Sequence, residues 1–151
     1  MRHSLRAVAT VLAMLVASAE RVPAQTLSVS GSPGLLRISN AVAGSEPISV
    51  SNSSTTYTIT TPNPNRLYNL TARLNAPMPP GITLSGTFAA PPGATSLGAI
   101  ALDATARNVV TNIPRRIDAT LGISYELSAL VTAGVVPNGS RTITLTIVQA
   151  P

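Results

Sequence analysis

The stretch LGISYELSALVTAGVVPNGSRTITLTIV, Leu121–Val148, decides the fold of this chain. Apolar and polar residues alternate through its first half, with the apolar set running from Ile123 to Val131, and the alternation returns over Thr142–Ile147. Successive side chains of a β-strand point to opposite faces, so each half predicts a strand with one apolar and one mostly polar face. Between the halves, Gly134 and Pro137–Ser140 tolerate the backbone angles of a turn. The stretch therefore predicts a β-hairpin.

A two-stranded hairpin is barely stable alone, so other strands must cover its apolar face. Short runs rich in Thr, Ser, Val and Ile recur between turn signals, at the spacing typical of sandwiches and barrels. The expected strands are Thr26–Ser30, Leu35–Ser39, Ile48–Ser51, Thr55–Thr60, Leu67–Asn75, Ile82–Phe88, Leu97–Leu102 and Asn108–Thr111. We expect loops at Asn52–Ser54 and Asn112–Thr120. The pattern predicts an all-β fold, a single Ig-like β-sandwich over residues 25–151.

The N-terminus predicts a signal peptide helix. A basic head in residues 2–6 precedes an apolar run over residues 7–19, which is shorter than the ~20 residues that span a bilayer. Small residues follow at the positions that a signal peptidase reads. We expect cleavage between Ala24 and Gln25, and Ala17–Ala19 offers a second site.

Removing residues 1–24 leaves a mature chain of 127 residues, enough for one domain with one core. That part contains seven Arg and four acidic residues, so its net charge is +3. It has no apolar run of membrane length, and we expect no membrane span in it. Because its Arg residues are scattered rather than clustered, the composition does not indicate a nucleic-acid-binding protein.

The residue types missing from the mature chain restrict its chemistry. The chain has no Cys, Lys or Trp, and its one His, His3, lies in the predicted signal peptide. Ser–His catalysis therefore lacks its base, and a Cys nucleophile is absent. Zinc, copper and haem sites depend largely on His or Cys. We expect a protein without enzymatic activity and without a cofactor.

Carboxylates are the remaining candidates for chemistry. The mature chain has four: Glu46, Asp103, Asp118 and Glu126. Two of them would be needed for glycoside hydrolysis, but Glu126 alternates with serines on the expected outer face of a strand. Asp103 and Asp118, together with Asn108 and Asn112, have the oxygen ligands that calcium prefers, although no spaced Asp-rich loop is present. Asp in loops and at strand ends more often forms turns.

Two further residue sets are candidates for binding. Arg115 and Arg116 lie in a Pro-containing segment that is a candidate interaction loop for an acidic partner, with a protease-sensitive point or an ordinary solvated loop as alternatives. Tyr57, Tyr68 and Tyr125 would be the platforms of a sugar site. All three lie in apolar alternation, which favours core positions.

Four segments together carry a family resemblance. They are Thr55–Thr60 (TTYTIT), Met78–Ile82 (MPPGI), Ile123–Tyr125 (ISY) and Ile143–Ile147 (ITLTI). With the signal peptide, they resemble bacterial secreted Ig-like β-sandwich proteins, some of which build cell-surface or fimbrial structures. The chain departs from chaperone–usher pilins, which usually have a disulfide that a chain without Cys cannot form.

These observations predict an exported, non-enzymatic β-sandwich with a structural or cell-surface interaction role, located in the periplasm, at the cell surface or outside the cell. The alternative is a glycan- or polymer-binding module that uses Arg and loop Tyr. Expected partners are another surface protein or a second copy joined through edge strands. The N-terminal strand, Thr26–Ser30, is the candidate for exchange, unless it pairs within its own sheet.

Overall fold

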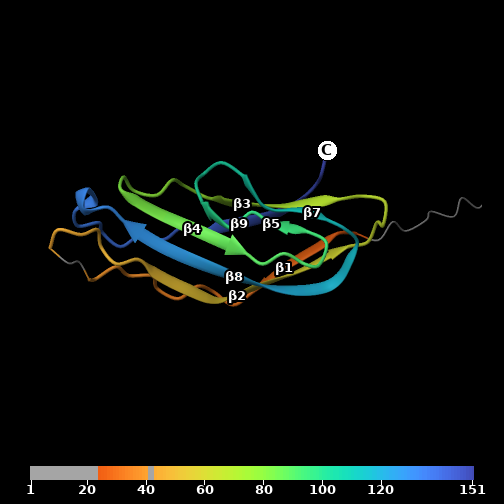
Figure 1. The fold of residues 1–151 in the computed structure, drawn as a ribbon, viewed down its shortest axis with the longest axis horizontal. Coiled ribbons are helices and arrows are strands. Elements are labelled where there is room, and N and C mark those ends of the chain that lie inside the picture. Colours follow the sequence, from red (N-terminus) through yellow and green to blue (C-terminus); the bar gives the residue numbers. More distant parts are fainter. Residues whose placement is uncertain (1–23, 41–42) are drawn as a thin grey trace, which may run out of the picture.

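In the residues that the structure describes, period-two alternation puts nearly all regular structure into β-strands (Figure 1). The computed structural model describes residues 24–40 and 43–151. The strands in chain order are β1 (Thr26–Ser30), β2 (Val50–Thr61), β3 (Tyr68–Leu74), β4 (Ile82–Phe88), β5 (Thr95–Ser96), β6 (Ala99–Ala101), β7 (Arg107–Ile113), β8 (Arg116–Ala129) and β9 (Ile143–Gln149). One 3-10 turn, Val131–Ala133, follows β8. The predicted signal peptide lies outside the described residues except for Ala24.

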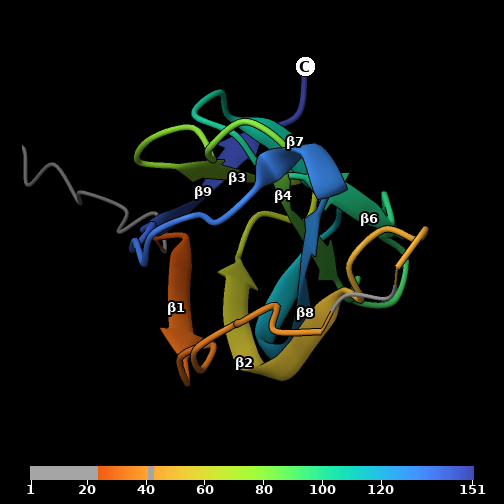
Figure 2. The ribbon, with the colours of Figure 1, turned by 90° about the vertical axis from the view of Figure 1, so that its left-hand side faces the viewer.

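The strands form two antiparallel sheets. The five-stranded sheet has the order β1-β2-β8-β4-β6, and the four-stranded sheet has the order β5-β7-β3-β9. Figure 2 shows the two sheets as opposed layers. The all-β prediction is confirmed, and two facing antiparallel sheets are the arrangement of a β-sandwich.

One apolar cluster fills the space between the sheets. Phe88 lies at its centre and meets Tyr57 and Tyr125 edge-on, with ring centroids 6.4 and 6.2 Å apart. Such edge-to-face pairs stabilise a core beyond their buried area. The fully buried members of the cluster come from both sheets: Tyr57, Ile59, Leu70, Phe88, Val109, Val110 and Ile113.

The predicted hairpin of Leu121–Val148 is wrong, although both of its strands exist. β8 pairs with β2 and β4 in one sheet, whereas β9 pairs with β3 in the other. The connection over residues 130–142 is too long to fix a two-strand register. β8 and β9 each have one apolar face. When the two strands lie in opposite sheets, these faces pack against each other; if the strands were neighbours in one sheet, both faces would point the same way and would need other strands to cover them. The predicted apolar face also ends early, because Val131 is exposed.

Two predicted loops are instead parts of strands. Asn52–Ser54 lies inside β2, where a register shift between Asn52 and Thr55 marks a β-bulge. The Asn52 Oδ1 atom accepts hydrogen bonds from the Ser54 N–H at 3.0 Å and the Ser54 hydroxyl at 2.7 Å, so turn-forming residues are accommodated without ending the strand. The predicted loop Asn112–Thr120 shrinks to the two residues between β7 and β8.

The remaining strand predictions differ mainly in their ends. Leu35–Ser39 is not a strand. The predicted strand Leu97–Leu102 shortens to β6, whereas Asn108–Thr111 extends at both ends to form β7. β1 and β4 have the predicted bounds.

Phe88→Ala is expected to lower the free energy of unfolding by about 3–5 kcal/mol, because it removes a fully buried ring and both edge contacts. Urea unfolding followed by circular dichroism measures this loss. The control, Leu35→Ala, alters an exposed side chain and should stay within about 0.5 kcal/mol of the parent protein. Similar losses for both variants would contradict the assigned core.

Gly31→Ala is expected to loosen β1 from β2. Gly31 has φ +78°, and a Cβ atom there would lie 2.6 Å from the Ser54 carbonyl oxygen. The positive φ costs about 1–2 kcal/mol, and the overlap adds about 1–3 kcal/mol. Gly98→Ala is a matched control, since Gly98 has φ +75° and an added methyl group there would meet nothing within 4 Å. Equal urea-unfolding losses in the two variants would contradict the close approach at Gly31.

Candidate functional site

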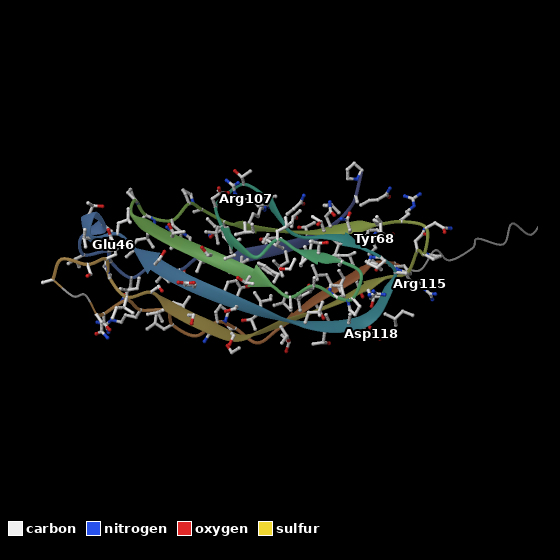
Figure 3. The ribbon with its side chains drawn as sticks, viewed as in Figure 1. Glu46, Tyr68, Arg107, Arg115 and Asp118 are labelled. Carbon is white, nitrogen blue, oxygen red and sulfur yellow. The ribbon has the colours of Figure 1, made fainter. Side chains whose placement is uncertain are left out.

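Two of the four carboxylates of residues 25–151, Glu46 and Asp118, lie toward opposite ends of the molecule (Figure 3). Asp118 and Glu126 lie on the same strand, β8, eight residues apart, which corresponds to about 26 Å. A glycosidase pair requires roughly 5–10 Å. Glu46 lies at the far end, where its carboxylate accepts a hydrogen bond from the Val131 N–H at 2.6 Å. Asp118 is therefore not placed to form a catalytic pair with Glu126 or with Glu46.

The Asp103 carboxylate has hydrogen-bond partners within its own turn. Its carboxylate forms an ion pair with Arg107 at 2.5 Å and accepts a hydrogen bond from the Thr105 N–H at 2.8 Å. These hydrogen bonds, the one from Arg107 first, lower the pKa of the Asp103 carboxyl below its ordinary value. Asp103 thus orders the turn between β6 and β7.

The four candidate calcium ligands do not converge. Asp103 faces Arg107, whereas Asp118, on β8, accepts a hydrogen bond from the Thr60 hydroxyl of β2 at 3.1 Å. Asn112 has φ 57° at a bulge in β7 and donates its backbone N–H to the Asn69 side chain at 3.2 Å. Over the part of the chain that the structure describes, no group of three acidic, His or Cys side chains is placed to hold a metal ion.

Arg115 and Arg116 have different surroundings. Arg115 is exposed in the turn between β7 and β8 (Figure 3). Arg116 begins β8, is partly buried, and donates its backbone N–H to the Thr61 hydroxyl at 2.9 Å. Its guanidinium donates to the Arg115 carbonyl at 2.9 Å, and its Nε atom is buried without a hydrogen-bond partner. The geometry leaves Arg115 alone available to a partner, and its interaction role stays a prediction.

All four aromatic residues of the chain are in the core. Tyr57, Tyr68, Tyr125 and Phe88 are each at most 3% exposed. The Tyr57 hydroxyl donates to the Ala89 carbonyl at 2.5 Å. The core assignment of the three tyrosines is therefore confirmed, and a sugar site built on tyrosine platforms has no exposed ring to use.

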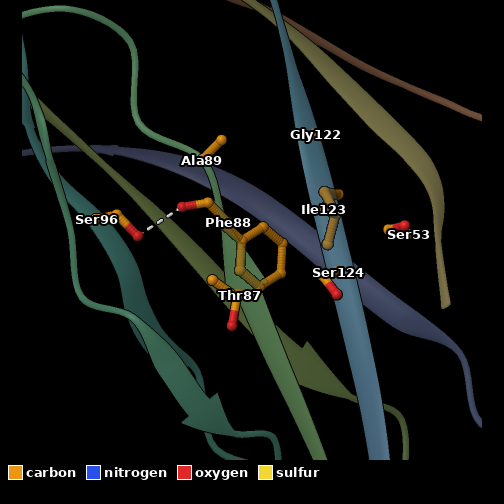
Figure 4. Close-up of a pocket in the computed structure, with 8 residues that line it drawn as sticks. All are labelled: Ser53, Thr87, Phe88, Ala89, Ser96, Gly122, Ile123 and Ser124. Carbon is orange, nitrogen blue, oxygen red and sulfur yellow. Dashed lines mark hydrogen bonds between the residues drawn. The ribbon is translucent and has the colours of Figure 1, made fainter. Parts of the chain in front are cut away.

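A shallow hollow of about 300 Å³ lies where β4, β8 and the β2 bulge meet (Figure 4). Its lining is mostly small: Ser53, Thr87, Phe88, Ala89, Ser96, Gly122, Ile123 and Ser124. The Ser96 hydroxyl donates to the Phe88 carbonyl at 2.6 Å, so one of its few polar groups is already used. No titratable side chain lines this hollow, which therefore offers no acid–base chemistry.

The two long sides of the sandwich differ in how they are closed. On one side, Leu97-Gly98 carries the chain directly from β5 of one sheet to β6 of the other, so the edges of the two sheets are joined. The opposite edges, β1 and β9, lie together on the other side (Figure 2). We call the side formed by β1 and β9 the open side.

The open side exposes apolar side chains that point toward the core. Val29 lies opposite Tyr57 in the antiparallel pair of β1 and β2, and directly opposite residues share a face of the sheet. Tyr57 is fully buried, yet Val29 is 51% exposed. On β9, Ile143, Leu145 and Ile147 pack against the core but are only partly buried. The core is thus incompletely covered at this side.

The sequence pointed to β1 as an edge strand but missed β9. The prediction of a hairpin gave β9 a partner on β8 and hid its free edge. The sequence did contain a signal for an unprotected edge. Edge strands usually avoid pairing by means of charged residues or Pro, and Thr142–Ala150 contains neither. In the structure β1 pairs with β2 of its own chain.

No protein-family model, no curated protein and no solved structure matches this chain. In the described ranges, the helical structure has neither the length nor the apolar character needed to cross a bilayer.

Buried tyrosines are expected to make the fold sensitive to alkali. Burial raises the pKa of the Tyr57 and Tyr125 phenols to about 12, against about 10 in the unfolded chain. Their contribution is complete below pH 10 and is lost as the pH rises toward 12, because the unfolded state ionises first. Each tyrosine should lower stability by up to about 1.4 kcal/mol per pH unit in this window.

Urea unfolding at several pH values, together with the ultraviolet absorbance of tyrosinate, measures this effect. Tyr125→Phe should make the alkaline decline less steep while leaving the packed ring in place. Ionisation of Tyr57 and Tyr125 near pH 10 in protein that is still folded would contradict the burial.

Proposed function

We propose that this protein is an exported, non-enzymatic β-sandwich of the Ig-like type with a structural or cell-surface interaction role. The signal-peptide pattern of residues 1–24 supports export, and the resemblance to bacterial secreted Ig-like proteins supports the location. The partner is another surface protein or a second copy of the chain.

The single observation that carries the proposal is the open side. An edge strand has unpaired backbone groups that another strand can use, and proteins without a pairing role usually protect such an edge with charge, Pro or a very short strand. β5 and β6, with two and three residues, fit that protection. β1 and β9 are longer, contain neither charge nor Pro, and have partly uncovered apolar residues between them.

The alternative, a glycan- or polymer-binding module, required an exposed tyrosine. Because all three tyrosines are buried, what supports this alternative is reduced to exposed Arg side chains such as Arg115. The edge-mediated interaction is the better supported function.

Expression of the full chain in a bacterial host tests this proposal. The chain recovered outside the cytoplasm should begin at Gln25 and should remain with the cell envelope after mild washing. Val29→Lys, which places an inward-pointing charge on the open side, should release most of the protein into the wash. Leu97→Lys is the matched control, since Leu97 is 44% exposed but lies on the closed side.

Equal retention of the two variants would exclude the open side as the interaction surface. Retention of the chain in the cytoplasm would overturn export. A turnover that disappears on changing Asp103 or Asp118 would overturn the non-enzymatic assignment.

A further inference from the structure

The two sheets do not match in width. β4 and β7 lie in contact across the sandwich, and each is the second strand from the closed side. Beyond this contact, toward the open side, the five-stranded sheet has three more strands (β8, β2 and β1) and the four-stranded sheet has two (β3 and β9). Among the described strands, the larger sheet is therefore one strand wider at the open side. The high exposure of Val29, on the inner face of β1, agrees with this count.

The place opposite β1 is one strand wide and adjoins the free edge of β9. Neighbouring strands of a sheet are about 4.8 Å apart, so an added strand beside β9 would lie directly over β1. Its inward side chains would cover Val29 and Leu27, which are the apolar residues of β1. Its backbone would pair with the unused N–H and C=O groups of β9, whose seven residues, ITLTIVQ, are all uncharged.

The same geometry excludes edge-to-edge pairing of two β9 strands. Antiparallel pairing of β9 with its copy would continue the four-stranded sheet across a two-fold axis. Each five-stranded sheet extends one strand further, so β1 of one copy and β2 of the other would compete for one position. The edge of β9 therefore has room for a single extended segment, but not for a second copy that pairs through its own β9.

Both ends of β9 are positively charged. Arg141 precedes β9 by two residues, and its Nε donates to the Pro77 carbonyl at 3.0 Å. At the other end, the Arg66 guanidinium donates to the side chain of Gln149, the last residue of the strand. The two guanidinium groups are thus about 20 Å or more apart along the strand direction. Both side chains contact residues near the ends of β3 or β9, so they would attract acidic residues that flank a bound seven-residue segment through their charge rather than by direct contact.

We propose that the open side binds one extended segment of a partner protein, about seven residues of alternating apolar and polar side chains with an acidic residue at each end. The segment adds to β9 as a fifth strand and covers Val29. This inference rests on the proposed function and names the chemistry of its partner.

A synthetic peptide tests the inference. The probe alternates Val and Thr over seven residues, has a Glu at each end, and carries a fluorophore for anisotropy measurements with the exported full chain. One control peptide has Lys at both ends. A second has N-methyl groups on alternate residues, with one version for each edge of the strand, because N-methylation removes the hydrogen-bond donors of that edge.

The Glu-ended probe should bind about five- to tenfold more tightly than the Lys-ended peptide at low ionic strength. The double variant Arg66→Gln, Arg141→Gln should abolish that preference. Val29→Lys should weaken binding of the Glu-ended probe about tenfold or more, because the added strand would bury the charge, whereas Leu97→Lys should leave binding unchanged. One of the two N-methylated versions should fail to bind.

Several results would overturn the inference. These are no binding of the Glu-ended probe, equal binding of Glu- and Lys-ended peptides, or full binding of both N-methylated versions. Light scattering that finds dimers of the parent protein but monomers of Val29→Lys would assign the open side to a second copy instead of a partner. If no peptide binds but Val29→Lys still loses envelope retention, the inference fails while the proposed function stands.

Discussion

The contact of Phe88 with Tyr57 and Tyr125 joins three strands, and the rest of the structure depends on it. These residues belong to β4, β2 and β8, so one ring binds the middle of the larger sheet together and presents a common surface to the smaller sheet. Gly86 makes room for this ring, since a Cβ atom there would lie 2.8 Å from Phe88. In a chain without Cys, such packing replaces the covalent links of many small exported domains.

Strand alternation could be read from the sequence, but the pairing of strands could not. The alternation of apolar and polar residues identifies which side chains of β8 and β9 face the core. The same alternation is expected whether the two strands are neighbours in one sheet or lie in opposite sheets, so it cannot distinguish these arrangements. The choice between them depends on the whole set of apolar faces to be covered. The turn-forming residues Asn52–Ser54 led to a wrong prediction of a loop for a similar reason. In the structure, Ser54 donates hydrogen bonds to the Asn52 side chain, and β2 continues through these residues.

For the candidate site, too, the sequence predicted some properties and not others. Composition alone argues against most catalytic chemistries for residues 25–151, because that part of the sequence has no Cys, His or Lys. The location of the proposed interaction surface could not be predicted, since it depends on which strands lie at the edges of the sheets. The sequence suggested β1 only as the candidate strand for exchange, whereas the free edge of β9 was hidden by the predicted hairpin. Arg116 illustrates the limit for single residues: its neighbour is exposed, but its own guanidinium lies against the chain.

The interaction proposed for the open side would link binding to stability. A strand that adds to β9 covers core residues which the isolated chain leaves partly exposed, so it stabilises only the folded state. A ligand at a hundred times its dissociation constant stabilises a fold by about 2.7 kcal/mol. That is a substantial part of the stability of a domain of this size. The physical cost of an uncovered, uncharged edge is a tendency to pair unspecifically with other strands. Under the proposal, such an edge would be most stable with its partner bound, so the folded state and the interaction would depend on each other.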